Sequence, residues 1–247
     1  MEDKGETTPY LSVVIPAYNE EKRILPTLDR IRGYLELQVY FGDVIVVDDG
    51  STDRTARLIE ERAAAWPSLT LIRNGRNRGK GYSVRNGFES AKGQILLFSD
   101  ADLSTPIEEI DKLLAAIRSG ADVAIGSRAL EKSDVRIHQP WYRELMGKTF
   151  NRIVRCIAVP GIHDTQCGFK AFTRKAAEAI IGRQRLCGFS FDVEMLFIAR
   201  RKGFSIREIP VVWMNEPNSR VRAIADSLKM LGDLIRIRWL HRNSRYG

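Results

Sequence analysis

The stretch Leu11-Ser-Val-Val-Ile-Pro-Ala-Tyr-Asn-Glu20 sets the pattern for the first half of the chain. Its apolar, β-branched beginning predicts a short buried strand over Leu11–Pro16. Asn19 is a residue type that caps helices, so we expect a helix directly after it. The apolar residues that follow recur at helical spacing: Ile24, Leu28, Ile31 and Leu35.

The same unit of one buried strand and one amphipathic helix then repeats. The predicted strands cover Asp43–Val47, Leu69–Arg73, Gln94–Phe98 and Asp122–Gly126. The predicted helices cover Thr52–Ala65, Tyr82–Ala91 and Pro106–Ser119. This alternation predicts an α/β fold with a doubly wound, mostly parallel sheet.

Beyond about residue 130 the pattern loosens. We predict helices at Arg143–Ala158 and Phe191–Lys202, a strand at Ser205–Trp213, and a turn-rich stretch from His163 to Lys170. The tail from Val221 places apolar residues on one helical face: Ile224, Leu228, Leu231, Ile235 and Trp239. We therefore predict one catalytic domain over residues 1–222 and a basic amphipathic helix over residues 223–247.

The composition is that of an ordinary globular protein, with 247 residues of which 44% are hydrophobic and 28% charged. The three cysteines show no metal-ligand spacing, so we expect reduced, buried thiols in a reducing compartment. No window approaches the roughly 18 apolar residues that a membrane-spanning helix needs. We expect a cytoplasmic protein, either free or peripheral on the cytoplasmic face of a membrane.

The formal net charge of +8 is concentrated near the C-terminus, where residues 217–247 hold seven Lys or Arg against Asp226 and Asp233, giving 7 − 2 = +5. Such a tail attracts nucleic acid or anionic lipid. We expect no nucleic-acid partner, because a binding motif and an aromatic platform are both lacking. The apolar face of the tail then meets either an anionic membrane surface or protein, in its own domain or in a second copy, and a homodimer is left open.

Polar clusters follow the predicted strands at the points where the strands end. Ligands of a doubly wound sheet bind beyond the carboxyl ends of its strands. Any one cluster could be a helix cap, but four converging at one edge indicate a binding site. They are Pro16-Ala-Tyr-Asn-Glu20, Asp48-Asp-Gly-Ser-Thr-Asp53, Asp100-Ala-Asp102 and Gly126-Ser-Arg128.

Asp100-Ala-Asp102 is the most informative of these clusters. Two carboxylates this close at a strand end can both reach one hard divalent cation, which prefers oxygen ligands. We expect Mg²⁺ or Mn²⁺ here, together with a substrate diphosphate. No Gly-x-Gly-x-x-Gly follows the first strand, which excludes a NAD-dependent dehydrogenase.

The loop from Arg73 to Arg85 holds five Lys or Arg and no acid. It either approaches a diphosphate or forms a solvated face, and the residues alone do not favour one over the other. Lys170 likewise either meets a phosphate or lies in solvent.

Several motifs taken together resemble those of the family 2 glycosyltransferases, which have the glycosyltransferase-A fold. They are Pro16-Ala-Tyr-Asn-Glu20, Val46-Val-Asp-Asp-Gly-Ser-Thr-Asp53, Asn77-Arg-Gly-Lys-Gly81, Ser99-Asp-Ala-Asp102 and Gly126-Ser-Arg128. Asp164-Thr-Gln-Cys-Gly-Phe-Lys170 and Phe191-Asp-Val-Glu194 are similar to segments of the dolichyl-phosphate β-glucosyltransferase group, with the polyprenyl-phosphate mannosyltransferases as nearest relatives. The resemblance covers about residues 10–222.

The resemblance implies a role for each matching residue. Asp100 and Asp102 are expected to hold the metal and the donor diphosphate, while Arg128 and Arg220 approach the donor or acceptor phosphates. Guanidinium groups suit this role because they bind phosphate through two hydrogen bonds. The base and ribose of the nucleotide are expected to contact Pro16, Tyr18, Glu20, Val47 and Asp49.

The acceptor decides whether a catalytic base is needed. A hydroxyl acceptor needs one, whereas a lipid phosphate is already anionic at pH 7. Asp192 begins a predicted helix, and it either caps that helix and positions the acceptor or acts as a base. We expect inverting transfer of glucose from UDP-glucose to a polyprenyl or dolichyl phosphate. The alternatives are mannose from GDP-mannose, or a glycan hydroxyl acceptor with Asp192 as base.

Overall fold

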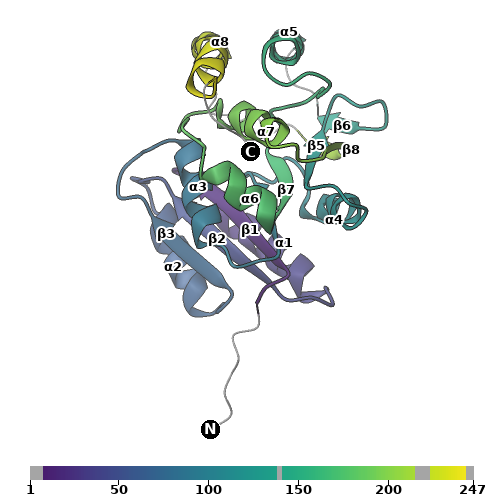
Figure 1. The fold of residues 1–247 in the computed structure, drawn as a ribbon. Helices are drawn as coiled ribbons and strands as arrows, with labels where there is room; N and C mark the ends of the chain where they lie inside the picture. The colour runs from purple at the N-terminus through teal and green to yellow at the C-terminus, as the bar shows by residue number, and fades with distance from the viewer. Residues whose placement is uncertain (1–7, 138–140, 215–222, 243–247) are drawn as a thin grey trace.

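The computed structural model describes residues 8–137, 141–214 and 223–242. Its centre is a seven-stranded sheet with the order β3-β2-β1-β4-β7-β5-β8 (Figure 1). All neighbouring strands are parallel except where β7 pairs with β4 and β5. The predicted mostly parallel α/β fold is therefore confirmed. The strands are β1 (Leu11–Ala17), β2 (Gly42–Asp48), β3 (Leu69–Arg73), β4 (Ile95–Ser99), β5 (Val123–Ser127), β7 (Phe169–Thr173) and β8 (Ile206–Pro210).

Helices cover both faces of this sheet, as a doubly wound arrangement requires (Figure 1). Side chains alternate along β1, so that Val13 and Ile15 pack into one core and Val14 into the other. On the first face lie α1 (Ile24–Glu36), α2 (Thr55–Ala64) and, after the short 3₁₀ helix Ile107–Glu109, α4 (Ile110–Arg118). On the second face lie α3 (Lys80–Ser90), α6 (Arg174–Ile181) and α7 (Phe191–Arg201).

The structure corrects the interpretation of the second half of the chain. The segment expected to be rich in turns leads into β7, which inserts antiparallel into the middle of the sheet, and α6 follows it directly. Lys170 concealed this strand from sequence reasoning, because a lysine in the middle of a buried strand is unexpected until its partner is known.

The predicted strand Ser205–Trp213 is in fact two strands in different sheets. β8 extends the main sheet beside β5, whereas β9 (Val212–Met214) pairs with β6 (Asp134–Ile137). The chain passes from one sheet to the other after Pro210, which lacks the backbone N–H that a continuing ladder needs. This step places Trp213 beside the loop that follows β5.

Two further helices, α5 (Trp141–Ile157) and α8 (Ala223–Leu240), lie side by side at the top of the view in Figure 1. The tail does not present a single apolar face. Met230, Leu234 and Ile237 are buried in the core shared with α7, while Ile235 and Trp239 are 69% and 65% exposed. No helix among the described residues is long and apolar enough to cross a membrane. The division of the chain at residue 222 stays a prediction.

Candidate active site

A cavity of about 480 Å³ opens at the carboxyl ends of β1, β2 and β4. Three of the four predicted polar loops line it, those after β1, β2 and β4, whereas Gly126-Ser-Arg128 does not. Helix α8 also lines it, which the sequence analysis did not predict. Six predicted site residues line it: Pro16, Tyr18, Glu20, Asp49, Asp100 and Asp102. The residues of the cavity wall that were not predicted include Ser83, Gly188, Phe189, Lys229 and Asp233.

Asp100 and Asp102 follow β4 and face this cavity together. Asp100 lies against Gly168, where any Cβ atom would collide with its carboxylate, so the start of β7 shapes the site. Asp102 Oδ1 accepts a hydrogen bond from the backbone N–H of Ser104 at 2.9 Å. Burial, and secondly the charge of Asp100, raise the pKa of Asp102. Two acids held together against their mutual repulsion indicate a site built for a cation.

The donor set fits Mg²⁺ or Mn²⁺ bound together with a diphosphate. Among the described residues, no three His, Cys, Asp or Glu side chains gather around one point. Asp100 and Asp102 would supply two oxygen ligands, and phosphate oxygens and water the others, as is usual for Mg²⁺ bound with nucleotides. Asp100 Oδ1 is held by the ammonium group of Lys80.

Two lysines near the site each pair with an aspartate. Lys80 Nζ is 2.7 Å from Asp100 Oδ1, and Lys170 Nζ is 2.6 Å from Asp192 Oδ1. Both ammonium groups also lie near the ring of Phe98, at 5.2 and 5.7 Å from its centroid. The basic loop from Arg73 to Arg85 was the sequence signal for Lys80, although it could not separate this lysine from its neighbours.

Asp192 is 4% exposed and its carboxylate is engaged by Lys170, which is completely buried and also donates to the backbone oxygen of Cys167 at 2.5 Å. Burial raises the pKa of Asp192, while Lys170 opposes that rise. The side chain does not line the cavity. This environment favours a positioning role for Asp192 over a proton-accepting one.

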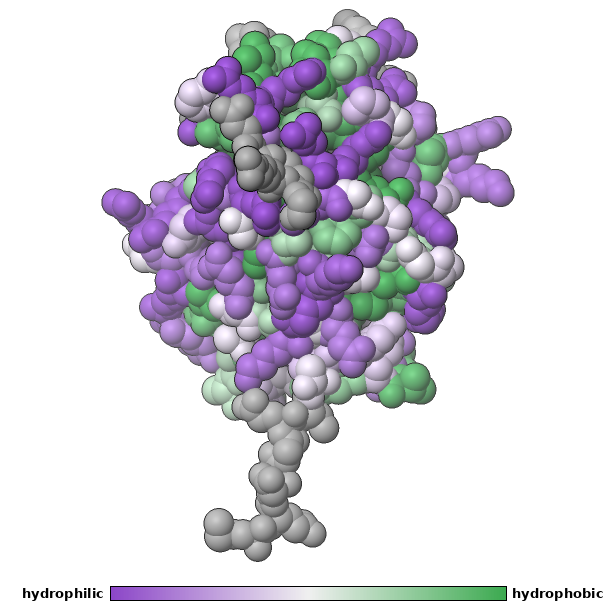
Figure 2. Space-filling view, viewed as in Figure 1, coloured by the Kyte–Doolittle hydropathy of each residue, from purple (hydrophilic) through white to green (hydrophobic). Residues whose placement is uncertain are grey.

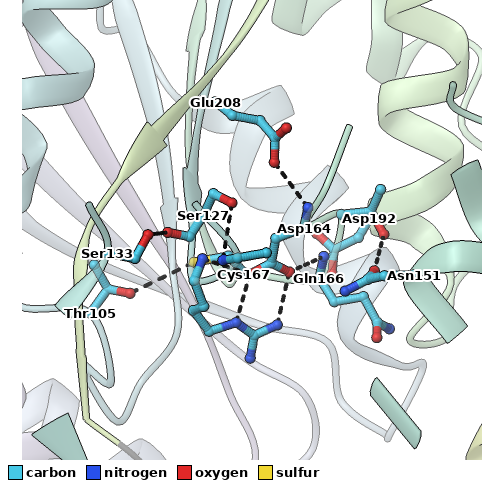
Figure 3. A network of polar contacts seen from close by, with 12 residues as sticks. Thr105, Ser127, Ser133, Asn151, Asp164, Gln166, Cys167, Asp192 and Glu208 are labelled. Atoms are coloured by element: carbon cyan, nitrogen blue, oxygen red, sulfur yellow. Dashed lines mark hydrogen bonds and ion pairs between the residues drawn. The ribbon is translucent and has the colours of Figure 1, made fainter. Parts of the chain in front are cut away.

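Arg128 is not among the residues that line the cavity, and its guanidinium group is paired with a carboxylate. Its Nε and Nη2 donate to the carboxylate of Asp164 at 2.7 and 2.9 Å, and its guanidinium group lies 5.3 Å from the ring centroid of Trp213. Asp164 is in turn fixed by Glu208, which accepts its backbone N–H at 2.9 Å (Figure 3). Burial alone would raise the pKa of Asp164, but Arg128 outweighs it and lowers that pKa to about 2.

Three other predicted site residues show specific local arrangements. Asp49 accepts hydrogen bonds from the backbone N–H groups of Arg78 and Gly79, at 2.9 and 2.8 Å, and so holds the loop that leads to Lys80. Glu20 is paired with Arg23 at the cavity wall. The side chain of Val47 is fully buried in the core and does not line the cavity.

The predicted role of Asn19 was wrong, whereas that of Arg220 is untested. Asn19 does not cap α1, which begins at Ile24; its Oδ1 instead accepts from the Thr52 backbone N–H at 2.7 Å and joins the loops after β1 and β2. Arg220 lies outside the described residues, so its contact with phosphate stays a prediction.

The family model described as Glycosyl transferase family 2 matches residues 12–181. The chain belongs to this family and is a glycosyltransferase. It is 37% identical over 255 residues to the dolichyl-phosphate β-glucosyltransferase of Saccharomyces cerevisiae, a match covering 96% of this chain and 76% of the relative. The human enzyme of that name is 37% identical over 252 residues, covering 94% and 76%.

Solved structures support the fold. Glucosyl-3-phosphoglycerate synthase from Mycobacterium tuberculosis, crystallised with phosphoglyceric acid, matches with a TM-score of 0.71 at 20% identity, over 93% of this chain and 80% of that one. The same synthase was solved with Mn²⁺, UDP and glucosyl-3-phosphoglycerate, and that structure matches with a TM-score of 0.70 at 20% identity over the same shares. At this identity the likeness establishes a shared glycosyltransferase-A fold.

Proposed function

We propose that this protein transfers glucose, with inversion, from UDP-glucose to a dolichyl or other polyprenyl phosphate. The observation that carries the proposal is the similarity to dolichyl-phosphate β-glucosyltransferases along nearly the whole chain. The cavity adds the chemistry, because it brings two carboxylates to the sheet edge where a nucleotide diphosphate would bind.

Mg²⁺ or Mn²⁺, held by Asp100 and Asp102, would neutralise the diphosphate and stabilise it as a leaving group. The protein's own residues position the reactants. Pro16, Tyr18 and Glu20 border the cavity on the β1 side, where we place the base and ribose. Arg128 is our candidate for binding the acceptor phosphate, because its Nη1 does not donate to Asp164.

No proton needs to be removed from a phosphate acceptor, because it is already anionic. The buried ion pair of Asp192 with Lys170 agrees with this mechanism, since an engaged carboxylate is a poor base. A glycan hydroxyl acceptor would require Asp192 to leave Lys170, and we rank that alternative lower. Glucose and UDP stand ahead of mannose and GDP, because the relatives named above are glucosyltransferases.

We further propose that the exposed face of α8 meets an anionic membrane, where a lipid phosphate acceptor is found. Ile235 and Trp239 are exposed beside Arg236 and Arg242. Figure 2 shows hydrophobic and hydrophilic side chains mixed over α8 at the top of the molecule. Exposed aromatic and basic side chains on one helix are typical of attachment to the membrane surface. A homodimer through the same face stays the alternative.

A product assay tests the proposed reaction. Purified protein is incubated with Mn²⁺, a labelled nucleotide sugar and dolichyl phosphate, and lipid-linked sugar is extracted. We expect product from UDP-glucose and little from GDP-mannose. Transfer to a free sugar or to phosphoglycerate, with none to dolichyl phosphate, would contradict the proposed acceptor.

A further inference from the structure

Lys80 is the first residue of α3, and the backbone on both sides of it is fixed. Gly79 has φ +98°, and a Cβ there would collide with the Cys187 carbonyl. On the other side, the backbone N–H of Gly81 donates to the same carbonyl at 2.8 Å. Asp49 holds the backbone N–H of Gly79. The lysine therefore starts from a rigid base, and only its flexible side chain is free to change partners.

The charges around its ammonium group are arranged in pairs. Lys170 and Asp192 are buried together and neutralise each other. Lys80 then faces Asp100 at 2.7 Å, with Asp102 on the same loop. A lysine side chain that faces a carboxylate at this distance is charged at pH 7.

The two oxygens of Asp100 have different surroundings. Both oxygens lie close to Gly168, Oδ2 being the closer, and Oδ1 also faces Lys80. A divalent cation approaching Oδ1 would meet a positive ammonium group already within hydrogen-bond distance of that oxygen. Like charges a few ångströms apart repel strongly in a partly buried site. The cavity wall includes both Lys80 and the acids, so a diphosphate bound there lies within reach of the ammonium group.

We propose that Lys80 is a positioning residue that exchanges partners: it neutralises Asp100 before the donor binds and passes to the donor diphosphate when it arrives, leaving Asp100 to the metal. The proposal rests on the metal and donor site proposed above. Lys80 thereby makes metal and nucleotide bind cooperatively, because each favours the arrangement that the other needs. It also keeps the acid pair from taking up a cation without a substrate.

Equilibrium binding of Mn²⁺ and UDP tests this coupling without an activity assay. The Mn²⁺ affinity is measured by the electron paramagnetic resonance signal of free Mn²⁺, with and without UDP, for the wild type, Lys80→Met and Lys80→Gln. Lys112→Met is the matched control. Lys112 Nζ also pairs with a carboxylate, that of Glu109, at 2.6 Å, but neither residue lines the cavity. Circular dichroism verifies that each variant is folded.

In the wild type we expect UDP to tighten Mn²⁺ binding strongly. In Lys80→Met, Mn²⁺ alone should bind about tenfold more tightly, and UDP alone about tenfold more weakly. The factor by which UDP tightens Mn²⁺ binding should shrink by a similar amount. A tenfold change in affinity is the low end for the loss of one charge-assisted hydrogen bond. Lys80→Gln should behave in the same way and the control like the wild type.

Two results would overturn the proposal. If Mn²⁺ alone binds both Lys80 variants no more tightly than the wild type, Lys80 does not compete with the metal. If UDP binding weakens while its effect on Mn²⁺ is unchanged, Lys80 is a fixed phosphate ligand and does not exchange. A wild type that binds neither Mn²⁺ nor UDP would instead contradict the donor and metal site itself.

Discussion

The role of each aspartate in and near this site depends on the charge of the side chain beside it. Arg128, in the loop after β5, is paired with the buried carboxylate of Asp164. Glu208 accepts a hydrogen bond from the backbone N–H of Asp164 and so helps to fix it (Figure 3). Asp102, by contrast, lies beside the like-charged Asp100, which contributes to its raised pKa. Asp164 and Asp102 thus differ in role because the first has an arginine partner and the second an acidic neighbour.

Replacing Asp164 with Asn should lower the free energy of unfolding at pH 7 by about 3 kcal/mol, because it leaves Arg128 without its partner. The pKa of Asp164 is lowered to about 2 in the folded protein. Its contribution is therefore fully present above the unfolded value of about 4 and lost as the pH falls toward 2. Urea unfolding at pH 7 and pH 3 should show the gap to the wild type narrowing.

Glu178→Gln is the control for this comparison, since Glu178 pairs with Arg174 in solvent and is 61% exposed. An exposed pair of this kind contributes about 0.5 kcal/mol. A gap for Asp164→Asn that is no larger than this, or that does not change with pH, would show that the pair does not stabilise the fold.

Asp102→Asn should reduce kcat/KM about a thousandfold, because the metal loses a charged ligand. The protein without metal should remain as stable as the wild type. The raised pKa of Asp102 means that folding disfavours its charged form, and Asn can still accept the hydrogen bond from Ser104. Steady-state kinetics check the expected loss of activity, and thermal unfolding checks the expected stability. Asp134→Asn, which removes an exposed ion pair, is the control. Normal activity would remove Asp102 from the site.

At the scale of elements, α8 belongs to the core and to the cavity at once. Its inner side buries Met230 and Leu234, and Asp233 lines the cavity and accepts from the Ser190 hydroxyl at 2.7 Å. His241, just beyond the helix, contacts the buried carboxylate of Glu194 at 2.8 Å. Deleting residues 223–247 would therefore expose core surface and cannot separate a membrane role from a structural one.

Point substitutions on the two sides of α8 can separate them. Leu234→Ala should lower the free energy of unfolding by about 2 to 5 kcal/mol, because it leaves a cavity in the core. Ile235→Ser with Trp239→Ser should change stability little, because both side chains are exposed. That double variant should instead lose binding to phosphatidylserine-containing vesicles in co-sedimentation.

Neutral phosphatidylcholine vesicles and raised salt should each weaken wild-type binding, because part of the attraction is electrostatic. Undiminished vesicle binding by the double variant would contradict the assignment of this face. A wild-type dimer that the same variant converts to a monomer in analytical ultracentrifugation would assign the face to a second copy.

At the scale of the whole molecule, helices pack on both faces of the sheet, and the cavity lies at the carboxyl ends of β1, β2 and β4. Nucleotide binding there should stabilise the entire domain, because the cavity wall draws residues from β1, the loop before α3, the loop after β4, and α8. UDP with Mn²⁺ at a hundredfold excess over its Kd should raise the midpoint of thermal unfolding by about 5 °C or more.

GDP should give a smaller rise at equal concentration, and chelation of the metal should remove most of the effect of UDP. Thermal-shift measurements over both nucleotides, with and without Mn²⁺, provide the check. A larger shift with GDP would favour the mannosyltransferase alternative.

The alternation of strands and helices, the mostly parallel sheet and the acid pair at the ends of its strands could all be predicted from the sequence. These features depend on periodicity and on residues close together along the chain, so they can be read without a structure. Six of the predicted site residues line the cavity for the same reason, because strand ends in a parallel sheet share one edge.

Which charged side chains pair with one another became known from the fold and could not be predicted from the sequence. Lys170 and Asp192 are 22 residues apart in sequence, and Arg128 and Asp164 are 36 apart. Their pairing depends on β7 entering the sheet against the direction of its neighbours, and on α7 packing over it. No local pattern records such contacts, because a buried ion pair exists only once distant segments have excluded water around it.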